Sequence, residues 1–374
     1  MIEYSSEQCG WFTHTLRAWF LKNGRHLPWR NHPTPYQVWV SEIMLQQTQV
    51  VTVIPYYERW MKLFPNVESL ASAAIDDVLK LWAGLGYYRR ARYLYEGAKV
   101  IVEQYHGEFP ADIRELRKIP GIGAYTAGAI AAFAFKQDVP AIDGNAERVL
   151  SRFFGIQGDI RGAERGTLEG VANEVASFGH CSDVNQAIMD LGASLCGKSA
   201  QCAQCPIAEK CYAFEHKMTE LLPAPKVRIE KTDEFRVALR LTSPNGRILI
   251  AQRSKDALLG GLWEYPMVTL SRGKGKSHQE KALKVLEQSR NELWIAWCQQ
   301  NQLHLTHWGT TRQFVKHTFT HIQMRVDLDE GVCDSMPIIA PNEDYEDFRW
   351  VEYDDIGKKY PISTLMKKMI GIGG

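Results

Sequence analysis

Hydrophobic residues recur at spacings of three and four through most of the first 215 positions of the chain. The clearest examples are residues 15–22, 38–47, 75–86, 91–105 and 126–135. This spacing places apolar side chains on one face of a helix. Turn-forming residues such as Pro, Gly and Asn separate these segments, and regular strand patterns are hard to find among them. The pattern predicts an all-helical domain over residues 1–216.

The pattern changes after residue 216. Residues 217–232 are charged, contain two prolines and show no sustained period, so we expect a linker there. Further along, two apolar runs, 235–241 and 247–253, flank the turn sequence Ser-Pro-Asn-Gly and predict a hairpin. Additional strands are expected at 303–310, 314–321 and 322–328, and helices at 278–288 and 362–370. The second domain, residues 233–374, is therefore predicted to be α+β.

Composition agrees with two domains and limits the classes of function. The chain has 374 residues, 45% of them hydrophobic, and a formal net charge of +1. A length of this order favours two compact domains over one. Because the net charge is so small, any positive field for nucleic acid must be local. We find neither a signal-peptide pattern nor an apolar run long enough to span a bilayer, so we expect a soluble, cytoplasmic protein that is not secreted.

Four of the eight cysteines lie within one short segment. Cys196, Cys202, Cys205 and Cys211 have the spacing Cys-x5-Cys-x2-Cys-x5-Cys. In a chain that is neither small nor visibly secreted, such a group indicates a metal site and not a disulfide framework. Both a [4Fe–4S] cluster and a structural zinc remain open. Zinc sites more often use two Cys-x2-Cys pairs, so the single pair flanked by single cysteines favours iron–sulfur.

A second motif occupies about residues 112–135. Pro120, Gly121, Ile122 and Gly123 separate a short helical segment from a helix of small residues that begins near Ala124. Glycine lets the backbone approach a phosphate, and the following helix start offers unpaired N–H donors. The motif therefore predicts a helix-hairpin-helix that grips a DNA backbone without reading its sequence. An ordinary packed turn between helices is the simpler alternative.

Two acidic residues have alternative interpretations. Asp143 stands at a loop-to-helix junction, where an aspartate is usually only an N-cap. Glu42 lies on a largely apolar predicted helix, where a glutamate is usually a solvated surface residue. From pattern alone neither is singled out as catalytic.

Five stretches in the same order carry a family resemblance: 27–60, 81–92, 116–130, 141–152 and 185–196. Together they closely resemble the MutY-type adenine DNA glycosylases, members of the helix-hairpin-helix superfamily that also contains endonuclease III. The run SEIMLQQTQV is the most specific part of the match. The resemblance implies base-excision repair of adenine mispaired with 8-oxoguanine or guanine in duplex DNA, with a [4Fe–4S] cluster as cofactor.

The resemblance also implies catalytic roles. Glu42 matches the general acid that protonates the adenine ring, and Asp143 matches the aspartate that stabilises the oxocarbenium-like sugar. Asn145 matches a polar partner of that aspartate. Tyr125 matches an active-site tyrosine at the position where strand-cleaving relatives carry a Schiff-base lysine. A monofunctional glycosylase that leaves an intact abasic site is therefore expected.

Further residues are matched to DNA and base recognition. Tyr87 resembles a wedge that enters the base stack beside the lesion, with Leu85 and Gln47 nearby. Without the match, Tyr87 would be taken as part of an aromatic core. Arg25 and Trp29 are expected to line the adenine pocket.

The second domain resembles the MutT-like, Nudix-fold domain of these enzymes, most visibly in LLGGLWEYP at 258–266. The following stretch, 267–288, lacks the glutamate pairs that hold magnesium in Nudix hydrolases, so we expect lesion recognition without pyrophosphate hydrolysis. Phe319, Thr320 and His321 resemble the loop that senses 8-oxoguanine, with Thr320 where serine is usual.

One departure and two alternatives remain. The family commonly has six residues between the first two cysteine ligands, and this chain has five. A glycosylase for another base, such as thymine in a G:T mismatch, would share the hairpin and the cysteines but generally lack the oxoguanine-reading domain. A catalytically inert iron–sulfur DNA-binding protein is the alternative from another class. A monomer is expected, and protein partners are not indicated.

Overall fold

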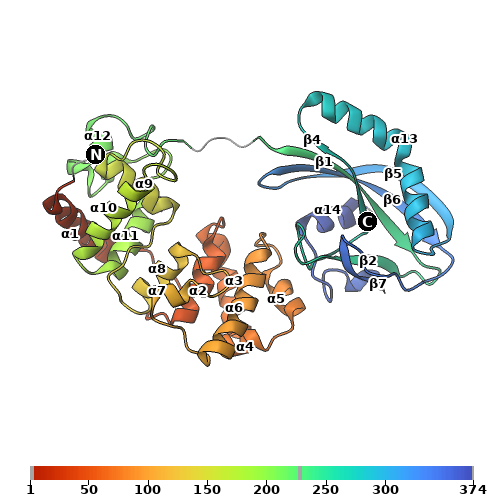
Figure 1. Ribbon diagram of the computed structural model, residues 1–374, viewed down its shortest axis with the longest axis horizontal. Coiled ribbons are helices and arrows are strands. Elements are labelled where there is room, and N and C mark those ends of the chain that lie inside the picture. The colour runs from red at the N-terminus through yellow and green to blue at the C-terminus, as the bar shows by residue number, and fades with distance from the viewer. Residues whose placement is uncertain (1–3, 226–229, 373–374) are drawn as a thin grey trace. The chain divides into compact units, whose positions relative to one another are not determined.

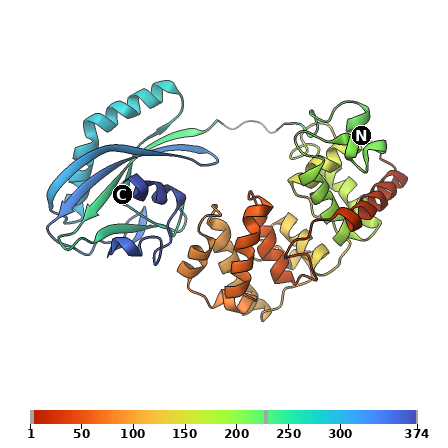
Figure 2. The same cartoon turned by 180° about the vertical axis from the view of Figure 1, so that it is seen from behind.

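The computed structural model describes residues 4–225 and 230–372. Contacts divide the chain into two compact units. The first, Met1–Ser72 with Tyr93–Val227, is called the helical unit here, and the second, Ala73–Arg92 with Arg228–Gly374, is called the sheet unit (Figures 1 and 2). No helix among the described residues is both long and apolar enough to cross a membrane.

Each segment predicted to be helical in the first 215 residues contains a helix, although the predictions 38–47, 75–86 and 126–135 run two to four residues past its end. No strand occurs among the described residues up to 225. The helices are α1 Ser6–Asn23, α2 Pro35–Leu45, α3 Val50–Leu63, α4 Val67–Ala71, α5 Ile75–Trp82, α6 Arg89–Tyr105, α7 Ile113–Leu116, α8 Ala124–Phe133, α9 Gly144–Phe154, α10 Arg165–Ser177, α11 Cys181–Ser194 and α12 Tyr212–Glu215. Short 3-10 turns η1 Cys202–Gln204 and η2 Ala208–Lys210 follow α11.

Packing within the helical unit positions the residues predicted to be catalytic. Helices α1, α9, α10 and α11 share one apolar core around Phe12 and Phe153. Helix α8 is buried over almost its whole length, and a Cβ on Gly128 would lie 2.5 Å from the Pro140 carbonyl oxygen. Glycine is therefore needed for the close approach of α8 to the strand-like segment that leads into Asp143.

The helix-hairpin-helix is formed by α7, which ends at Leu116, and α8. Turn hydrogen bonds from the Ile119 amide to Leu116 and from the Ile122 amide to Ile119 connect the two helices. Gly121 has a φ of +80°, and a Cβ there would lie 2.6 Å from the Cβ of Tyr93. A glycine is therefore required at this turn.

Besides α5 and the start of α6, the sheet unit contains one seven-stranded sheet and two α-helices. Its elements are β1 Thr232–Thr242, β2 Ile248–Arg253, β3 Trp263–Glu264, β4 Met267–Gly273, α13 Lys276–Gln300, β5 Leu305–Thr318, β6 Ile322–Cys333, β7 Tyr345–Val351, η3 Tyr353–Asp355 and α14 Thr364–Ile372. The sheet order is β3-β2-β1-β6-β5, with β4 paired to β1 and β7 to β2. The β1–β2 hairpin is confirmed, because Thr242 pairs with Ile248 in antiparallel register.

Alternate residues of β1 face two different cores. Val237 and Leu239 pack with Leu286 and Trp294 of α13. Ala238 packs instead with Leu365 and other residues of α14. Helices therefore cover both faces of the sheet, as expected for an α+β domain.

Two strand predictions need correction. Segments 303–310 and 314–321 were expected as separate strands, but they form the single strand β5, whose register with β6 shifts between Thr310 and Phe314. A bulge of this kind bends a strand without ending it. Because the bulge interrupts the alternation of apolar and polar residues, the sequence pattern predicted two strands. The strands β3, β4 and β7 were not predicted.

Residues 73–92 were predicted as part of the helical domain, but their contacts place them in the sheet unit. The Tyr88 hydroxyl donates to the Ile362 carbonyl over 3.3 Å, and Arg92 Nε donates to the Gly260 carbonyl over 3.2 Å. The predicted end of the helical domain at residue 216 and the predicted start of the second domain at residue 233 stay predictions.

Candidate active site

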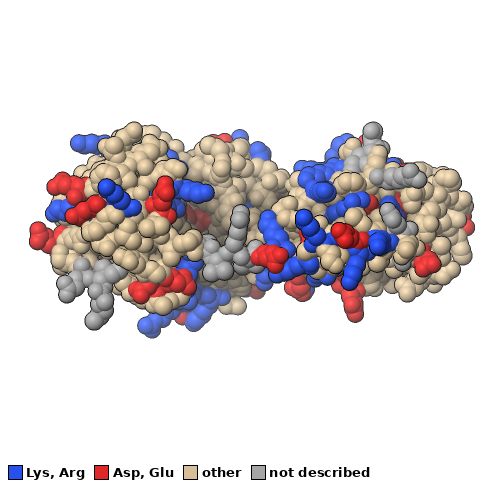
Figure 3. Space-filling view, turned by 90° about the horizontal axis from the view of Figure 1, so that it is seen from above, with Lys and Arg blue, Asp and Glu red and all other residues tan. Residues whose placement is uncertain are grey.

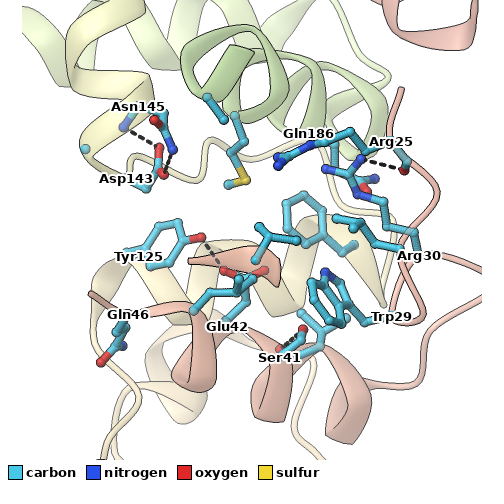
Figure 4. A pocket seen from close by; sticks show the side chains of 18 of the residues that line it. Arg25, Trp29, Arg30, Ser41, Glu42, Gln46, Tyr125, Asp143, Asn145 and Gln186 are labelled. Atoms are coloured by element: carbon cyan, nitrogen blue, oxygen red, sulfur yellow. Dashed lines mark hydrogen bonds between the residues drawn. The ribbon is translucent and has the colours of Figure 1, made fainter. Parts of the chain in front are cut away.

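A pocket of about 820 Å³ in the helical unit collects most of the residues predicted to be catalytic or base-binding. Its walls come from α2, α8, the start of α9, α11 and the loop before α2 (Figure 4). The predicted residues that line it are Arg25, Trp29, Glu42, Gln47, Tyr125, Asp143 and Asn145. Residues separated by as much as 120 positions in the chain thus share one cavity.

Glu42 is the most unusual acid of the pocket. Its residue is only 5% exposed, so the interpretation as a solvated surface glutamate is wrong. Burial raises its pKa to about 7, and the nearby charge of Asp143 adds to this. The hydrogen bond donated by the Tyr125 hydroxyl and the charge of Arg30 act in the opposite direction. Near neutral pH the Glu42 carboxyl is therefore able to hold and release a proton.

Asp143 is an N-cap and a pocket residue at the same time. Its Oδ1 accepts hydrogen bonds from the backbone amides of Asn145 and Ala146 at 3.0 and 2.7 Å, and its Oδ2 accepts from Asn145 Nδ2 at 2.7 Å. Burial raises the pKa of Asp143, while these hydrogen bonds oppose the rise. Hydrogen bonds to a carboxylate and a helix N-terminus both favour its ionised form.

The hydroxyl of Tyr125 connects α8 to this pair of acids. Burial raises the pKa of Tyr125 well above its ordinary value, and the charges of Glu42 and Asp143 add to the effect. The phenol therefore stays protonated and acts as a donor to Glu42 (Figure 4). Together the three side chains provide one carboxyl that exchanges a proton, one carboxylate and one neutral donor.

The structure also reveals a carboxylate that the sequence analysis missed. Asp190 on α11 is 2% exposed and accepts hydrogen bonds from Arg25 Nε at 2.8 Å and from Arg30 Nη1 at 2.7 Å. Burial raises the pKa of Asp190, but the hydrogen bonds from the two arginines outweigh it and leave the pKa lowered. This carboxylate therefore holds two guanidinium groups in fixed positions at the pocket wall.

Gln186, one turn before Asp190, lines the pocket and was also missed. A signal was present, because Gln186 and Asp190 have the i, i+4 spacing of one helix face in the otherwise apolar run 186–192. Trp29, in contrast, was among the predicted residues; it lines the pocket, is 6% exposed and lies edge-on to Tyr57.

Two of the three residues predicted to lie at the opened base stack have left-handed backbone conformations. Gln47 and Tyr87 have φ values of +56° and +49°, which are costly for residues other than glycine. Tyr87 is 48% exposed, whereas Leu85 is buried. Within the sheet unit, the Tyr87 hydroxyl lies 2.9 Å from Thr320 Oγ1, at hydrogen-bond distance.

The predicted lesion loop joins β5 to β6. The Phe319 amide donates to the Ile322 carbonyl over 2.8 Å, which closes a tight turn. Phe319 packs against the core beneath α14, and Thr320 and His321 are exposed. Phe319 therefore fixes the loop to the core, while the polar side chains of Thr320 and His321 face solvent.

The four clustered cysteines line one small cavity with Arg152 and Phe153. Arg152 Nη1 lies 3.4 Å from the Sγ of Cys196. Among the described residues, no three His, Cys, Asp or Glu side chains lie close enough to share one metal ion. Four thiols that line one cavity are a donor set used both by iron–sulfur clusters and by structural zinc.

Comparisons with known protein families cover both units. Residues 40–170 match the model of the HhH-GPD superfamily of base excision DNA repair proteins, and residues 237–371 match the NUDIX domain model. The chain is 34% identical to the adenine DNA glycosylase of Mus musculus, an alignment that covers 96% of this chain and 77% of the mouse protein.

Two solved structures resemble the first part of the chain. A thermostable thymine-DNA glycosylase is 26% identical with a TM-score of 0.52, and the match covers 56% of this chain and 98% of that protein. Endonuclease III in a non-covalent DNA complex is 20% identical with a TM-score of 0.50, covering 58% and 99%, and it shows the fold alone.

Proposed function

Because this chain belongs to the adenine DNA glycosylase family of base-excision repair enzymes, we propose that it hydrolyses the N-glycosidic bond of adenine mispaired with 8-oxoguanine or guanine. The substrate is duplex DNA, and the product is an abasic site with an intact backbone. The observation that carries this proposal is the pair Glu42 and Asp143 in one pocket, with Glu42 buried and its pKa raised to about 7.

Glu42 supplies the proton. Adenine leaves a sugar slowly unless one of its ring nitrogens is protonated. A carboxyl whose pKa lies near 7 is protonated in a large fraction of molecules at neutral pH and transfers that proton readily. The Tyr125 hydroxyl accepts no proton in this step but stabilises the carboxylate that remains on Glu42.

Asp143 stabilises the sugar. As the bond breaks, positive charge develops on the sugar ring, and an ionised carboxylate beside it lowers the barrier. The amides of Asn145 and Ala146 and the Asn145 side chain keep Asp143 ionised and fixed in orientation. The base leaves with the proton from Glu42, and water then adds to the cationic sugar and gives its proton to the Glu42 carboxylate.

The proposal that the DNA strand stays intact rests on which amines line the pocket, because strand cleavage needs an amine that forms a Schiff base with the sugar. Tyr125 stands where a Schiff-base lysine would be needed. Among the described pocket residues, the one lysine is Lys136, whose Nζ donates to the Phe133 carbonyl at 2.8 Å and to Ser182 Oγ at 3.2 Å. We therefore assign a monofunctional reaction.

Recognition of the opposite base is assigned to the loop with Phe319, Thr320 and His321. Its contact with Tyr87 supports this assignment, because the loop and the predicted wedge are joined within one unit. A flipped adenine requires the opened stack to be supported and its partner to be held. Gly121 and Gly123 of the helix-hairpin-helix are assigned to the DNA backbone.

The cysteine loop would hold a [4Fe–4S] cluster through Cys196, Cys202, Cys205 and Cys211. When bound, the cluster ties the loop after α11 into a fixed shape. Absorbance at about 400 nm together with iron analysis of the purified protein tests this assignment. A protein with zinc and no iron would overturn it.

A single-turnover reaction tests the proposed function. Duplexes carry adenine opposite 8-oxoguanine, guanine or thymine, or thymine opposite guanine, and the products are analysed with and without alkali. We expect adenine release opposite 8-oxoguanine and guanine, with strand breaks only after alkali. Release of thymine from G:T would favour a thymine glycosylase, and tight binding without release would favour an inert binding protein.

A further inference from the structure

One end of the sheet brings together the ends of four strands. Thr232 of β1 pairs with Ile322 of β6, Asp233 of β1 with Gly273 of β4, and Thr318 of β5 with Gln323 of β6. The loop at 319–321, assigned above to the lesion, lies at this same end. The turn from β4 into α13 also begins here.

This end of the sheet is strongly basic. We define the basic rim as Lys231, Arg272, Lys274, Lys276 and Lys316, of which all but the half-buried Lys231 are exposed. Figure 3 shows Lys and Arg side chains gathered on one part of the sheet unit's surface. The chain as a whole has a net charge of only +1, so this field is local.

The acids near the rim offset only part of this charge. Asp233 and Glu234 are buried, and Glu234 is bound by both Arg236 and Arg272. The exposed Glu230 lies 3.7 Å from Lys274. Among the described residues, Lys231, Lys276 and Lys316 have no carboxylate within 4.0 Å.

Arg272 is held ready for an external anion. Its Nε donates to Glu234 Oε2 over 2.7 Å, while its side chain remains 58% exposed. The guanidinium has further N–H donors beyond those used by Glu234. Because the buried carboxylate already orders this side chain, binding a phosphate there costs less side-chain entropy than binding by a free lysine.

The rim has the dimensions of a stretch of DNA backbone. Neighbouring strands are about 4.8 Å apart, so β5 and β4 are separated by roughly 14 Å across three strand spacings. This corresponds to about four phosphates of one DNA strand along the helix axis. Glu280 is the one acid in residues 271–284, so the turn from β4 into α13 is basic.

We propose that the basic rim binds the phosphate backbone of the DNA strand that carries 8-oxoguanine, next to the loop at 319–321. The choice of strand rests on the proposed function, because that loop is assigned to the lesion. The rim contributes affinity that is independent of sequence, whereas the loop contributes discrimination.

The test uses the full-length protein with Lys274, Lys276 and Lys316 all replaced by Gln. Arg272 is kept, since its removal would leave the buried Glu234 with one partner fewer. Arg247→Gln is the matched control, because Arg247 is exposed and adjoins Ile248, whose partner Thr242 is at the opposite end of β1. Melting temperatures confirm that each variant is folded.

Fluorescence anisotropy then measures the Kd for plain and A:8-oxoguanine duplexes over a range of salt concentrations. If all three lysines contact phosphate, the slope of log K against log salt becomes shallower by about 2.7 for both duplexes, and Arg247→Gln leaves it unchanged. An unchanged slope and Kd in the triple variant would overturn the proposal.

Single-turnover adenine release at saturating protein separates this proposal from the proposed function. The triple variant should release adenine at the wild-type rate once it is saturated. Wild-type protein that binds DNA with a steep salt slope yet releases no adenine would refute the proposed function and leave the rim intact.

Discussion

The pocket of the helical unit and the interior of the sheet unit both bury carboxyl groups, but they compensate the burial differently. In the sheet unit, Glu264 is 2% exposed and accepts from Arg253 Nε at 2.6 Å. In the pocket, Glu42 is 5% exposed, and the side-chain donor that it receives is the neutral hydroxyl of Tyr125.

This difference separates structural from chemical carboxyls. An arginine partner keeps a buried carboxylate ionised and fixes it in the fold. A neutral donor offsets less of the desolvation cost, so the pKa of Glu42 rises to about 7 and the group becomes able to transfer a proton. Burial alone therefore does not identify a catalytic carboxyl. The hydrogen-bond partner of a buried acid decides whether that acid stabilises the fold or takes part in the reaction.

The largest effect is expected for Glu42→Gln. Loss of the general acid should lower the single-turnover rate of adenine release by about 10²- to 10⁴-fold, while DNA binding survives. Asp143→Asn should also abolish most of the activity, by loss of charge stabilisation.

The matched control for Glu42→Gln is Glu147→Gln, measured in the same assay. Glu147 lines the same pocket but is paired with Arg161 and Arg165, so the comparison predicts a change of at most a few-fold. Full activity in Glu42→Gln, or an equal loss in Glu147→Gln, would break the distinction between the two kinds of carboxyl.

Arg253→Met should show the opposite pattern. It leaves Glu264 buried with Tyr345 as its remaining side-chain partner, and breaking such a pair costs about 3–5 kcal/mol of unfolding free energy. Denaturant unfolding measures this loss. At a temperature where the variant is folded, adenine release per folded molecule should equal wild type, and a slowed chemical step would show that the sheet unit takes part in catalysis.

Much of the fold could be predicted because its signals are local. Helices such as α2 and α6 follow from apolar periodicity, and the β1–β2 hairpin from its turn residues. The bulge in β5 was not visible, since a register shift depends on the partner strand β6.

The site residues could be predicted from the family resemblance, but not from the local pattern of residue types in the sequence. Glu42 looks like a surface residue until α8 and Tyr125 cover it. Asp190 and Arg30 meet across 160 positions, and Tyr87 and Thr320 across 233, so no local pattern records them. Long-range packing sets these pairs, and it becomes visible only in the folded chain.

A smaller effect is expected for the pH dependence of the free energy of unfolding, to which the buried carboxyl of Glu42 contributes. Its pKa in the folded state is about 7, above the ordinary 4.5, so folding binds a proton between these values. The contribution of Glu42 to stability is complete below about pH 4.5 and is lost as pH rises through 7. Relative to wild type, Glu42→Gln should therefore gain up to about 3 kcal/mol between pH 4.5 and pH 8. Denaturant unfolding at the two pH values checks this, and an equal difference at both would contradict the raised pKa.

The smallest effect is expected for Tyr125→Phe, and it probes the neutral donor directly. The rate of adenine release should fall as pH rises above about 7, because Glu42 must be protonated to act. The Tyr125 hydroxyl stabilises the Glu42 carboxylate and so lowers its pKa. Removing the hydroxyl raises that pKa, and the alkaline limb of the single-turnover profile should move to higher pH. A merely structural role for Tyr125 would lower the rate at all pH values without moving the limb. A limb that moves to lower pH would show that the hydroxyl favours the protonated acid, and the difference between neutral and arginine partners would then need another cause.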